Sequence, residues 1–274
     1  MSIKNVLKTF FSPFLKKKVQ RYIPTEEFVD LSPGDKVGIY GSSHGNIIAL
    51  KKITEIMIKD GAKYVFHLGD IMDEHAGYIE CFDYVINHDI IKPVVGNHDL
   101  LIVNKDEIHN YEQEYIDLAL KAEKHFNRDS QYINALMNMP SKITTPFFSL
   151  VHESVEFPYY AKITKLKKKS SVYGKTPDEN LDAVFNSTIL HPYFTGSDHK
   201  SYIINTVKLK KKEILPNTQL KIKGAAIVSV PSVSLSKDKN YTHGYCMVEC
   251  NEDKSIKIEF FDLPEMLIEN GEVI

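Results

Sequence analysis

The pattern of hydrophobic and polar residues in the first third of the chain predicts strands that alternate with a helix. Two short apolar runs, KVGIY (36–40) and YVFHLGD (64–70), predict strands, and GNIIALKKITEIMIKDGA (45–62) between them repeats apolar residues at helical spacing. A further run, IIKPVVGNHD (90–99), predicts a third strand that ends in polar residues. This order of strand, helix and strand predicts parallel neighbours joined by a right-handed crossover.

The pattern changes near Pro146. Before it, residues 106–140 carry helical repeats and predict a helical insertion that could cap a site. After it, the chain is mostly strand-like, with one helical segment at 178–187. The strand-like runs are 147–154, 188–196, 201–210, 220–230, 244–250 and 254–261. We therefore expect an α/β fold of two packed mixed β-sheets flanked by helices.

The expected organisation is a single large domain with short additions at both ends. With 274 residues, the chain is long enough to form a hydrophobic core that is stable without disulfides or structural metals. We place the domain at 35–265, a basic N-terminal extension at 1–34 and a tail at 266–274. Three cysteines at irregular spacing favour a reducing compartment, and neither a membrane-spanning run nor a secretory signal is recognisable. The expectation is a soluble, cytoplasmic protein.

The charge pattern excludes recruitment of nucleic acid or membrane by the protein as a whole. Lysine and arginine total 34 against 36 acidic residues, a formal charge of −2. Residues 1–24 are locally basic, however, and their apolar positions could lie on a membrane surface or dock onto a protein partner. A helix that packs against its own domain has the same pattern, and this interpretation is favoured. The lysine runs at 165–169 and 208–212 are typical of solvated loops or hairpins.

Side chains that can bind metal recur where the predicted strands end. They are His44, Asp70, Asn97 with His98, His152 and His199. In an open α/β sheet the carboxyl ends of the strands meet at one crevice, so residues far apart in the sequence are brought together there. One histidine near a strand is usually structural, but five such positions in series indicate a common site.

In order and spacing, these residues resemble the motifs of the calcineurin-like metallophosphoesterases. That family carries Asp-x-His, Gly-Asp-x-x-Asp, Gly-Asn-His-Asp/Glu, a lone His and Gly-His-x-His, and this chain has GSSHG, GDIMD, GNHD, LVHES and GSDH. The resemblance runs from about Lys36 to Cys250. It implies a four-layer α-β-β-α sandwich and hydrolysis of a phosphate ester by a phosphatase or phosphodiesterase.

The resemblance also implies a role for each matching residue. His44, Asp70 and His199 would bind a first metal, and Asp70 as a bridge, Asn97 and His152 would bind a second; no other cofactor is implied. His98 would protonate or stabilise the leaving oxygen, and Asp73 would hold it. Two cations about 3.5–4 Å apart neutralise a phosphate ester and generate hydroxide near neutral pH. Ligands of this mixed kind suit manganese, iron, zinc or nickel.

Two positions depart from the family pattern. Ser42 stands where the first Asp is expected, and Ser197 stands where the last motif has its first histidine. Each metal therefore loses one protein ligand, and a neutral hydroxyl is a poor replacement, so the second site could be weak. Three protein ligands can still hold a catalytic ion when water fills the rest. We therefore expect a phosphoesterase with an altered centre; the alternative is a catalytically inactive binding or scaffold protein.

Overall fold

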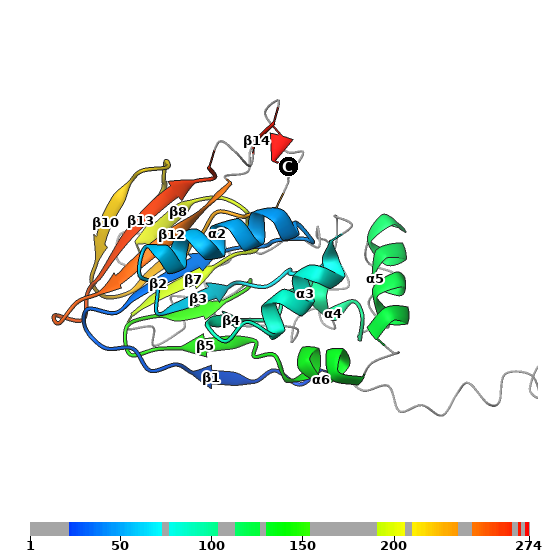
Figure 1. Ribbon diagram of the computed structural model, residues 1–274. Helices are drawn as coiled ribbons and strands as arrows, with labels where there is room; N and C mark the ends of the chain where they lie inside the picture. Colours follow the sequence, from blue (N-terminus) through cyan, green and yellow to red (C-terminus); the bar gives the residue numbers. More distant parts are fainter. Residues whose placement is uncertain are drawn as a thin grey trace, which may run out of the picture.

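The fold consists of two β-sheets that pack face to face, with helices on the outer face of one of them (Figure 1). The computed structural model describes residues 22–72, 77–103, 113–126, 130–153, 191–205, 210–234, 243–264, 268–269 and 272–273. The predicted helix at 178–187 lies outside these ranges. The expected pair of packed mixed sheets with flanking helices is confirmed.

Among the described residues, the smaller of the two sheets has six strands, and it contains the predicted strand–helix–strand unit. Its strands, in spatial order, are β10 (Gln219–Ile222), β13 (Ile256–Asp262), β12 (Gly244–Cys250), β2 (Lys36–Tyr40), β3 (Tyr64–His67) and β4 (Ile91–Pro93). Strands β2, β3 and β4 are parallel, whereas β12 pairs antiparallel with β2 and with β13. The parallel part therefore directs the ends of β2, β3 and β4 to the same edge.

The larger sheet has seven strands within the part of the chain that the structure describes, and it contributes the rest of the strand ends. In spatial order they are β1 (Glu26–Phe28), β5 (Lys142–Thr144), β6 (Ser149–Val151), β7 (Pro192–Thr195), β11 (Ala226–Ser229), β8 (Tyr202–Asn205) and β9 (Lys210–Glu213). Strands β6 and β7 are parallel neighbours, and β1 pairs parallel with β5. Strand β1 thus lies within the predicted N-terminal extension, residues 1–34. A two-stranded pair, β14 (Ile268–Glu269) with β15 (Glu272–Val273), follows near the C-terminus.

Alternation along the strands produces one core between the sheets and another under the helices. On β2, Val37 and Ile39 face the larger sheet, while Tyr40 belongs to the helix side. Phe148 links the two sheets, with its ring centroid 6.1 Å from that of Phe66 and 5.2 Å from that of Phe194. Burial of these aromatic rings removes a large apolar area from water and fixes the distance between the sheets. The strand ends at the site edge are thereby held in register.

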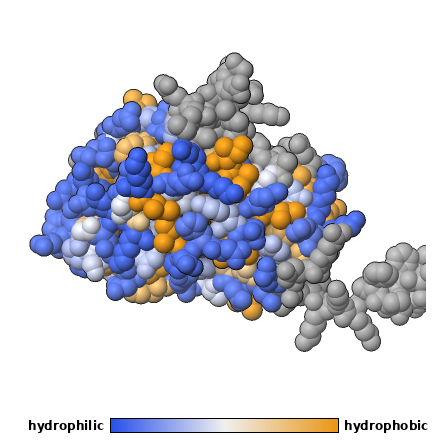
Figure 2. Space-filling view, viewed as in Figure 1, coloured by the Kyte–Doolittle hydropathy of each residue, from blue (hydrophilic) through white to orange (hydrophobic). Residues whose placement is uncertain are grey.

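The helices are α2 (Ile47–Lys59), α3 (Tyr78–Ile86), α4 (Asn97–Leu100), α5 (Gln113–Phe126) and α6 (Ser130–Asn138). Asn46 begins α2, because its side-chain oxygen accepts the N–H of Ala49 at 3.1 Å. Helices α3, α5 and α6 meet through the rings of Phe82, Phe126 and Tyr132. The face that carries α2 is largely polar, with small apolar groups scattered over it (Figure 2). No helix in the described ranges combines the length and hydropathy that crossing a bilayer requires.

Candidate metal centre

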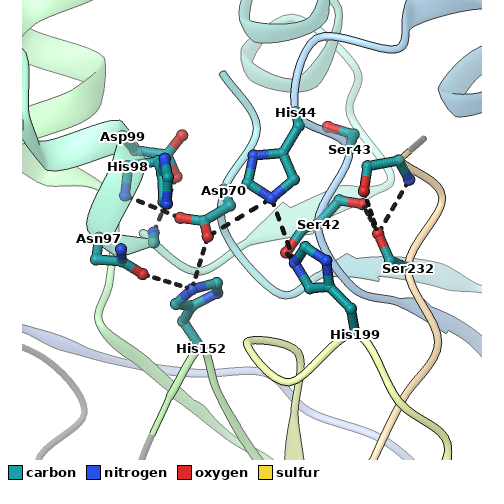
Figure 3. A network of polar contacts seen from close by, with 12 residues as sticks. Ser42, Ser43, His44, Asp70, Asn97, His98, Asp99, His152, His199 and Ser232 are labelled. Atoms are coloured by element: carbon teal, nitrogen blue, oxygen red, sulfur yellow. Dashed lines mark hydrogen bonds and ion pairs between the residues drawn. The ribbon is translucent and has the colours of Figure 1, made fainter. Parts of the chain in front are cut away.

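The candidate residues lie together at one edge of the two sheets, in the loops that follow five strands (Figure 3). Ser42 and His44 follow β2, Asp70 follows β3, and Asn97 with His98 opens α4 after β4. From the larger sheet, His152 follows β6 and His199 follows β7. The structure therefore brings together the residues that the sequence separates by up to 157 positions.

Three of these residues have an unusual backbone conformation. His44, Asp70 and His199 have φ angles of +44°, +52° and +51°, in the left-handed region that side chains other than glycine rarely adopt. Such conformations cost of order 1–3 kcal/mol each and persist where the surrounding structure imposes them, which is common at functional sites. Here the N–H groups of Ser43 and His44 both donate to the Asp70 carbonyl, at 3.0 and 2.9 Å. The turns after β2 and β3 therefore hold each other in the strained form.

Two glycines allow the Asp70 turn to approach its neighbours closely. A Cβ on Gly69 would lie 2.7 Å from the N atom of Gly96 and 2.7 Å from Nδ1 of His152. A Cβ on Gly96 would overlap the Asp70 carboxylate. The glycines of the GD and GNHD motifs are therefore required by contact distance.

The first group of donor atoms consists of His44, His199 and Asp70. The two histidine Nε2 atoms lie 3.3 Å apart, and Oδ2 of Asp70 lies 3.9 Å from Nε2 of His44. All three residues are buried, and one ligand atom from each lies within 4.8 Å of the others. Burial lowers the pKa of His44 well below its usual value and that of His199 to about 4, so both rings are neutral at pH 7. A neutral imidazole is the form that binds metal.

The second group consists of His152, Asp70 and Asn97. Nε2 of His152 lies 3.0 Å from Oδ2 of Asp70 and 3.0 Å from Oδ1 of Asn97, while Nδ1 donates to the Leu68 carbonyl at 2.5 Å. Burial opposes a charge on this ring, but the Asp70 carboxylate outweighs burial and raises the pKa of His152 to about 9. Although burial opposes its charge too, the surrounding histidines hold the pKa of Asp70 well below its usual value.

These donor sets fit divalent metal ions. Oδ2 of Asp70 lies 3.9 Å from Nε2 of His44 and 3.0 Å from Nε2 of His152, so this one oxygen faces both groups. The Leu68 carbonyl fixes the Nδ1 proton of His152, so Nε2 is the atom available to a cation, the kind of outer support that metal-binding histidines usually have. The oxygens of Asp70 and Asn97 both lie 3.0 Å from that nitrogen.

Ser42 faces the first group with its hydroxyl. Its Oγ lies 2.9 Å from Nε2 of His199, and its side chain is fully buried. Its carbonyl accepts the hydroxyl of Ser232 at 2.7 Å and the N–H groups of Val233 and Ser234 at 3.1 Å each. The backbone of Ser42 is therefore held at the site whatever its side chain is.

The structure places the remaining predicted residues less directly. The N–H of His98 donates to Oδ1 of Asp70 at 2.9 Å, and its ring contacts that of His44 edge-on, with centroids 5.1 Å apart. His98 also lines a narrow crevice with residues of α5. Ser197 lies in the turn after β7, where its N–H donates to the His152 carbonyl at 3.0 Å. Asp73 lies outside the described residues, so its pairing with His98 stays a prediction.

Several buried polar residues that hold the turns of the site were not predicted from the sequence. The buried carboxylate of Asp99 accepts three backbone N–H groups, and the hydroxyl of Ser43 lies 2.9 Å from Nε2 of His67. Burial, with the neighbouring charge of Asp70, raises the pKa of Asp99 to about 7. Asp99 is the last letter of the GNHD motif, so a signal for it existed, but its partners are set only by the fold. Asp198, the neighbour of His199 in the sequence, accepts the hydroxyl of Tyr202.

Comparison with solved structures shows that other proteins share this fold. The chain resembles the structure of a metallophosphoesterase from Sphaerobacter thermophilus with a TM-score of 0.60, at 16% identity, over 85% of this chain and 90% of that one. It also resembles a protein provisionally assigned as a diadenosine tetraphosphatase, with a TM-score of 0.52 at 14% identity, over 87% and 99% of the two chains. At these identities the likeness shows the fold alone.

No curated protein sequence matches the chain significantly. The model of the calcineurin-like phosphoesterase family, in contrast, matches residues 36–198, more than half of the chain. That range contains the GSSHG, GDIMD, GNHD and LVHES motifs and ends at Asp198, one residue before the last histidine of GSDH. The chain belongs to the calcineurin-like phosphoesterase family.

Proposed function

We propose that the protein is a metal-dependent phosphoesterase with an altered metal centre, which hydrolyses a phosphomonoester or phosphodiester with water as the nucleophile. Family membership implies a phosphate-ester substrate. The observation that supports metal dependence is the convergence of three histidine nitrogens and the Asn97 oxygen around the single Asp70 carboxylate. Manganese, iron, zinc or nickel would suit these nitrogen and oxygen donors.

The residues divide the work between binding and proton transfer. His44 and His199 would hold one ion through neutral imidazoles, Asn97 and His152 a second, and Asp70 would contact both. When bound there, the cations would neutralise the phosphate and lower the pKa of water. His98 lies against His44 and beside the carboxylate of Asp70, from where its ring could give a proton to the leaving oxygen. Asp73 is the proposed partner that orients the His98 ring.

The serine at position 42 changes the charge of the proposed centre more than its geometry. Where the family pattern has an aspartate, the hydroxyl of Ser42 lies 2.9 Å from His199 and carries no charge. The first ion would therefore be held by one carboxylate instead of two, and its affinity would be lower. This same observation favours the second candidate, a catalytically inactive protein that keeps the fold for binding or scaffolding. A docking role for residues 1–24 would fit that candidate, and most of that segment lies outside the described residues.

Metal content and hydrolysis measured together test the proposal. The purified chain would be loaded with Mn²⁺, Fe²⁺, Zn²⁺ or Ni²⁺ and assayed with para-nitrophenyl phosphate and bis-para-nitrophenyl phosphate. We expect turnover that depends on the added metal. Asp70→Asn should abolish both turnover and metal binding, whereas His98→Gln should lower turnover while the metal stays bound. A folded chain that turns over neither ester with any of the four ions would overturn the proposal and favour the scaffold.

A further inference from the structure

Asp99 is a buried carboxylate that the proposed chemistry does not use. It is 0% exposed, and its oxygens accept backbone N–H groups: Oδ1 those of Ile71 at 2.8 Å and Met72 at 3.1 Å, and Oδ2 that of Gly96 at 2.9 Å. Figure 3 shows Asp99 beside His98 and away from His199. With its oxygens occupied in this way, Asp99 supports the backbone of the site.

The hydrogen bonds of Asp99 are one half of a reciprocal arrangement between two turns. Asp99 follows β4 and binds the backbone of the turn after β3, whereas Asp70 follows β3 and accepts the N–H of His98 after β4, at 2.9 Å. Each turn thus gives one carboxylate to the backbone of the other. Oδ1 of Asp70 is used in this contact, which leaves Oδ2 directed at His152 and His44.

A carboxylate at position 99 is costly for the fold, so its presence points to a geometric role. Burial of a carboxylate is unfavourable unless hydrogen bonds compensate, and the nearby charge of Asp70 adds repulsion. The two oxygens of Asp99 together accept the N–H groups of Ile71, Met72 and Gly96, which a side chain with a single acceptor oxygen cannot do.

From this arrangement we infer that Asp99 is a positioning residue, which fixes the distance between the oxygen of Asp70 and the ligands that follow β4. The inference rests on the proposed function, because it concerns the same ligands. Without the carboxylate of Asp99, the turn at Ile71 and Met72 loses its acceptor, and Asp70 can shift relative to Asn97 and His98. A misplacement of about 1 Å at a reacting centre can cost on the order of 100-fold in rate.

The variant Asp99→Asn tests this directly, because an amide cannot accept hydrogen bonds on both of its terminal atoms. We expect it to bind Mn²⁺ at least about tenfold more weakly than the wild type and to lose on the order of 100-fold in kcat, with a smaller change in KM. The matched control is Asp35→Asn, since Asp35 also accepts a backbone N–H, that of Ser32 at 2.8 Å, far from the site. The control should bind metal and turn over as the wild type does.

Two further measurements separate positioning from simple stability. Amide hydrogen exchange at Ile71 and Met72 should accelerate in Asp99→Asn relative to the strands β2 and β3. Asp99→Glu keeps both carboxylate oxygens, so it should bind Mn²⁺ more tightly than Asp99→Asn and more weakly than the wild type. If Asp99→Asn does not fold, the same measurements are made on Asp99→Glu. A folded Asp99→Asn with wild-type Mn²⁺ affinity and kcat would overturn the inference, even if its Tm were lower.

Failure of the inference about Asp99 can be distinguished from failure of the proposed function. If the wild type binds Mn²⁺ but hydrolyses neither ester, the proposed activity fails, and the loss of Mn²⁺ affinity in Asp99→Asn still supports the role of Asp99. If the wild type binds no metal, hydrogen exchange decides. Unchanged protection of Ile71 and Met72 in Asp99→Asn would then overturn the inference.

Discussion

The Nε2 atoms of His44 and His199 lie 3.3 Å apart, and both rings are neutral at pH 7 because burial lowers their pKa values. The hydroxyl of Ser42 lies 2.9 Å from the second of these nitrogens, where the family pattern places a carboxylate. Two facing imidazole nitrogens can share at most a proton unless a cation lies between them. If the proposed metal binds here, the identity of residue 42 would therefore affect how strongly this pair holds it.

Ser42→Asp is expected to raise the affinity of the first group for Mn²⁺ or Zn²⁺ by at least about tenfold, since it adds a charged ligand beside His199. Titration calorimetry on the metal-free protein would measure the change. Ser42→Asn is the matched control, because it has the shape of aspartate without the charge, and it should gain much less. Unchanged affinity in Ser42→Asp would mean that the turn after β2 does not face a metal.

The strained backbone of His44 predicts a reversal of the usual order of alanine and glycine. At φ +44°, His44→Gly should be more stable than His44→Ala by about 1 kcal/mol in the metal-free protein, because glycine has no Cβ to clash. Chemical denaturation would measure the difference. Glu55, exposed in the middle of α2, provides the control, where Glu55→Ala should be more stable than Glu55→Gly by a similar amount. If alanine were more stable than glycine at both positions, the backbone at His44 would not be strained.

His67 should make the metal-free protein sensitive to mild acid. Burial lowers its pKa to about 3, so the folded chain keeps this ring neutral while the unfolded chain gains a proton below about pH 6.5. Its contribution to the free energy of unfolding is therefore complete above pH 6.5 and is lost as the pH falls toward 3, by about 2 kcal/mol at pH 5.

The test compares the Tm at pH 7 and pH 5. His67→Gln should be less stable at pH 7, because Nε2 of His67 lies 2.9 Å from the hydroxyl of Ser43. Its Tm should nevertheless fall less between the two pH values than that of the wild type. His125→Gln on α5, where the ring is partly exposed, should keep the wild-type difference. The same Tm difference in His67→Gln and the wild type would show that His67 does not titrate on unfolding.

Metal binding by His152 should release a proton. Its pKa of about 9 means that the ring is charged at pH 7.5, and a metal can bind only after that proton leaves. Calorimetry in buffers of different ionisation enthalpy should therefore report about one proton released per ion bound at this group. Ions bound by His44 and His199, which are already neutral, should release none. Proton release that persists in His152→Ala would assign the proton to another residue.

The strand–helix–strand unit at 36–70 was predictable because its periodicity is local. Helix α3 (Tyr78–Ile86) was not predicted, since its run of aromatic and β-branched residues lacks the long helical repeat of α2. Strand β9 (Lys210–Glu213) falls in a lysine run for which the sequence favoured a solvated loop or hairpin. Its antiparallel pairing with β8 places the lysines on a sheet edge, where charge protects against further pairing.

The candidate site was predictable as a set of residues and not as a network. Motif spacing identified His44, Asp70 and His152 because the chain order of the family is retained. The contacts of Asp99 with Ile71 and Met72 join turns 27 to 28 positions apart, and no local pattern indicates such a pairing. Sequence shows which side chains a site contains, whereas the fold decides which of them bind one another.

The anchoring of the Ser42 carbonyl by Ser232, Val233 and Ser234 has an evolutionary consequence. Because these bonds involve only the backbone of Ser42, its side chain can change without loss of the turn. Selection could therefore change the donor atom beside His199 by a single substitution while the protein stays folded. On the proposed function, a lineage with this chain would retain a short mutational route between weak and strong metal binding.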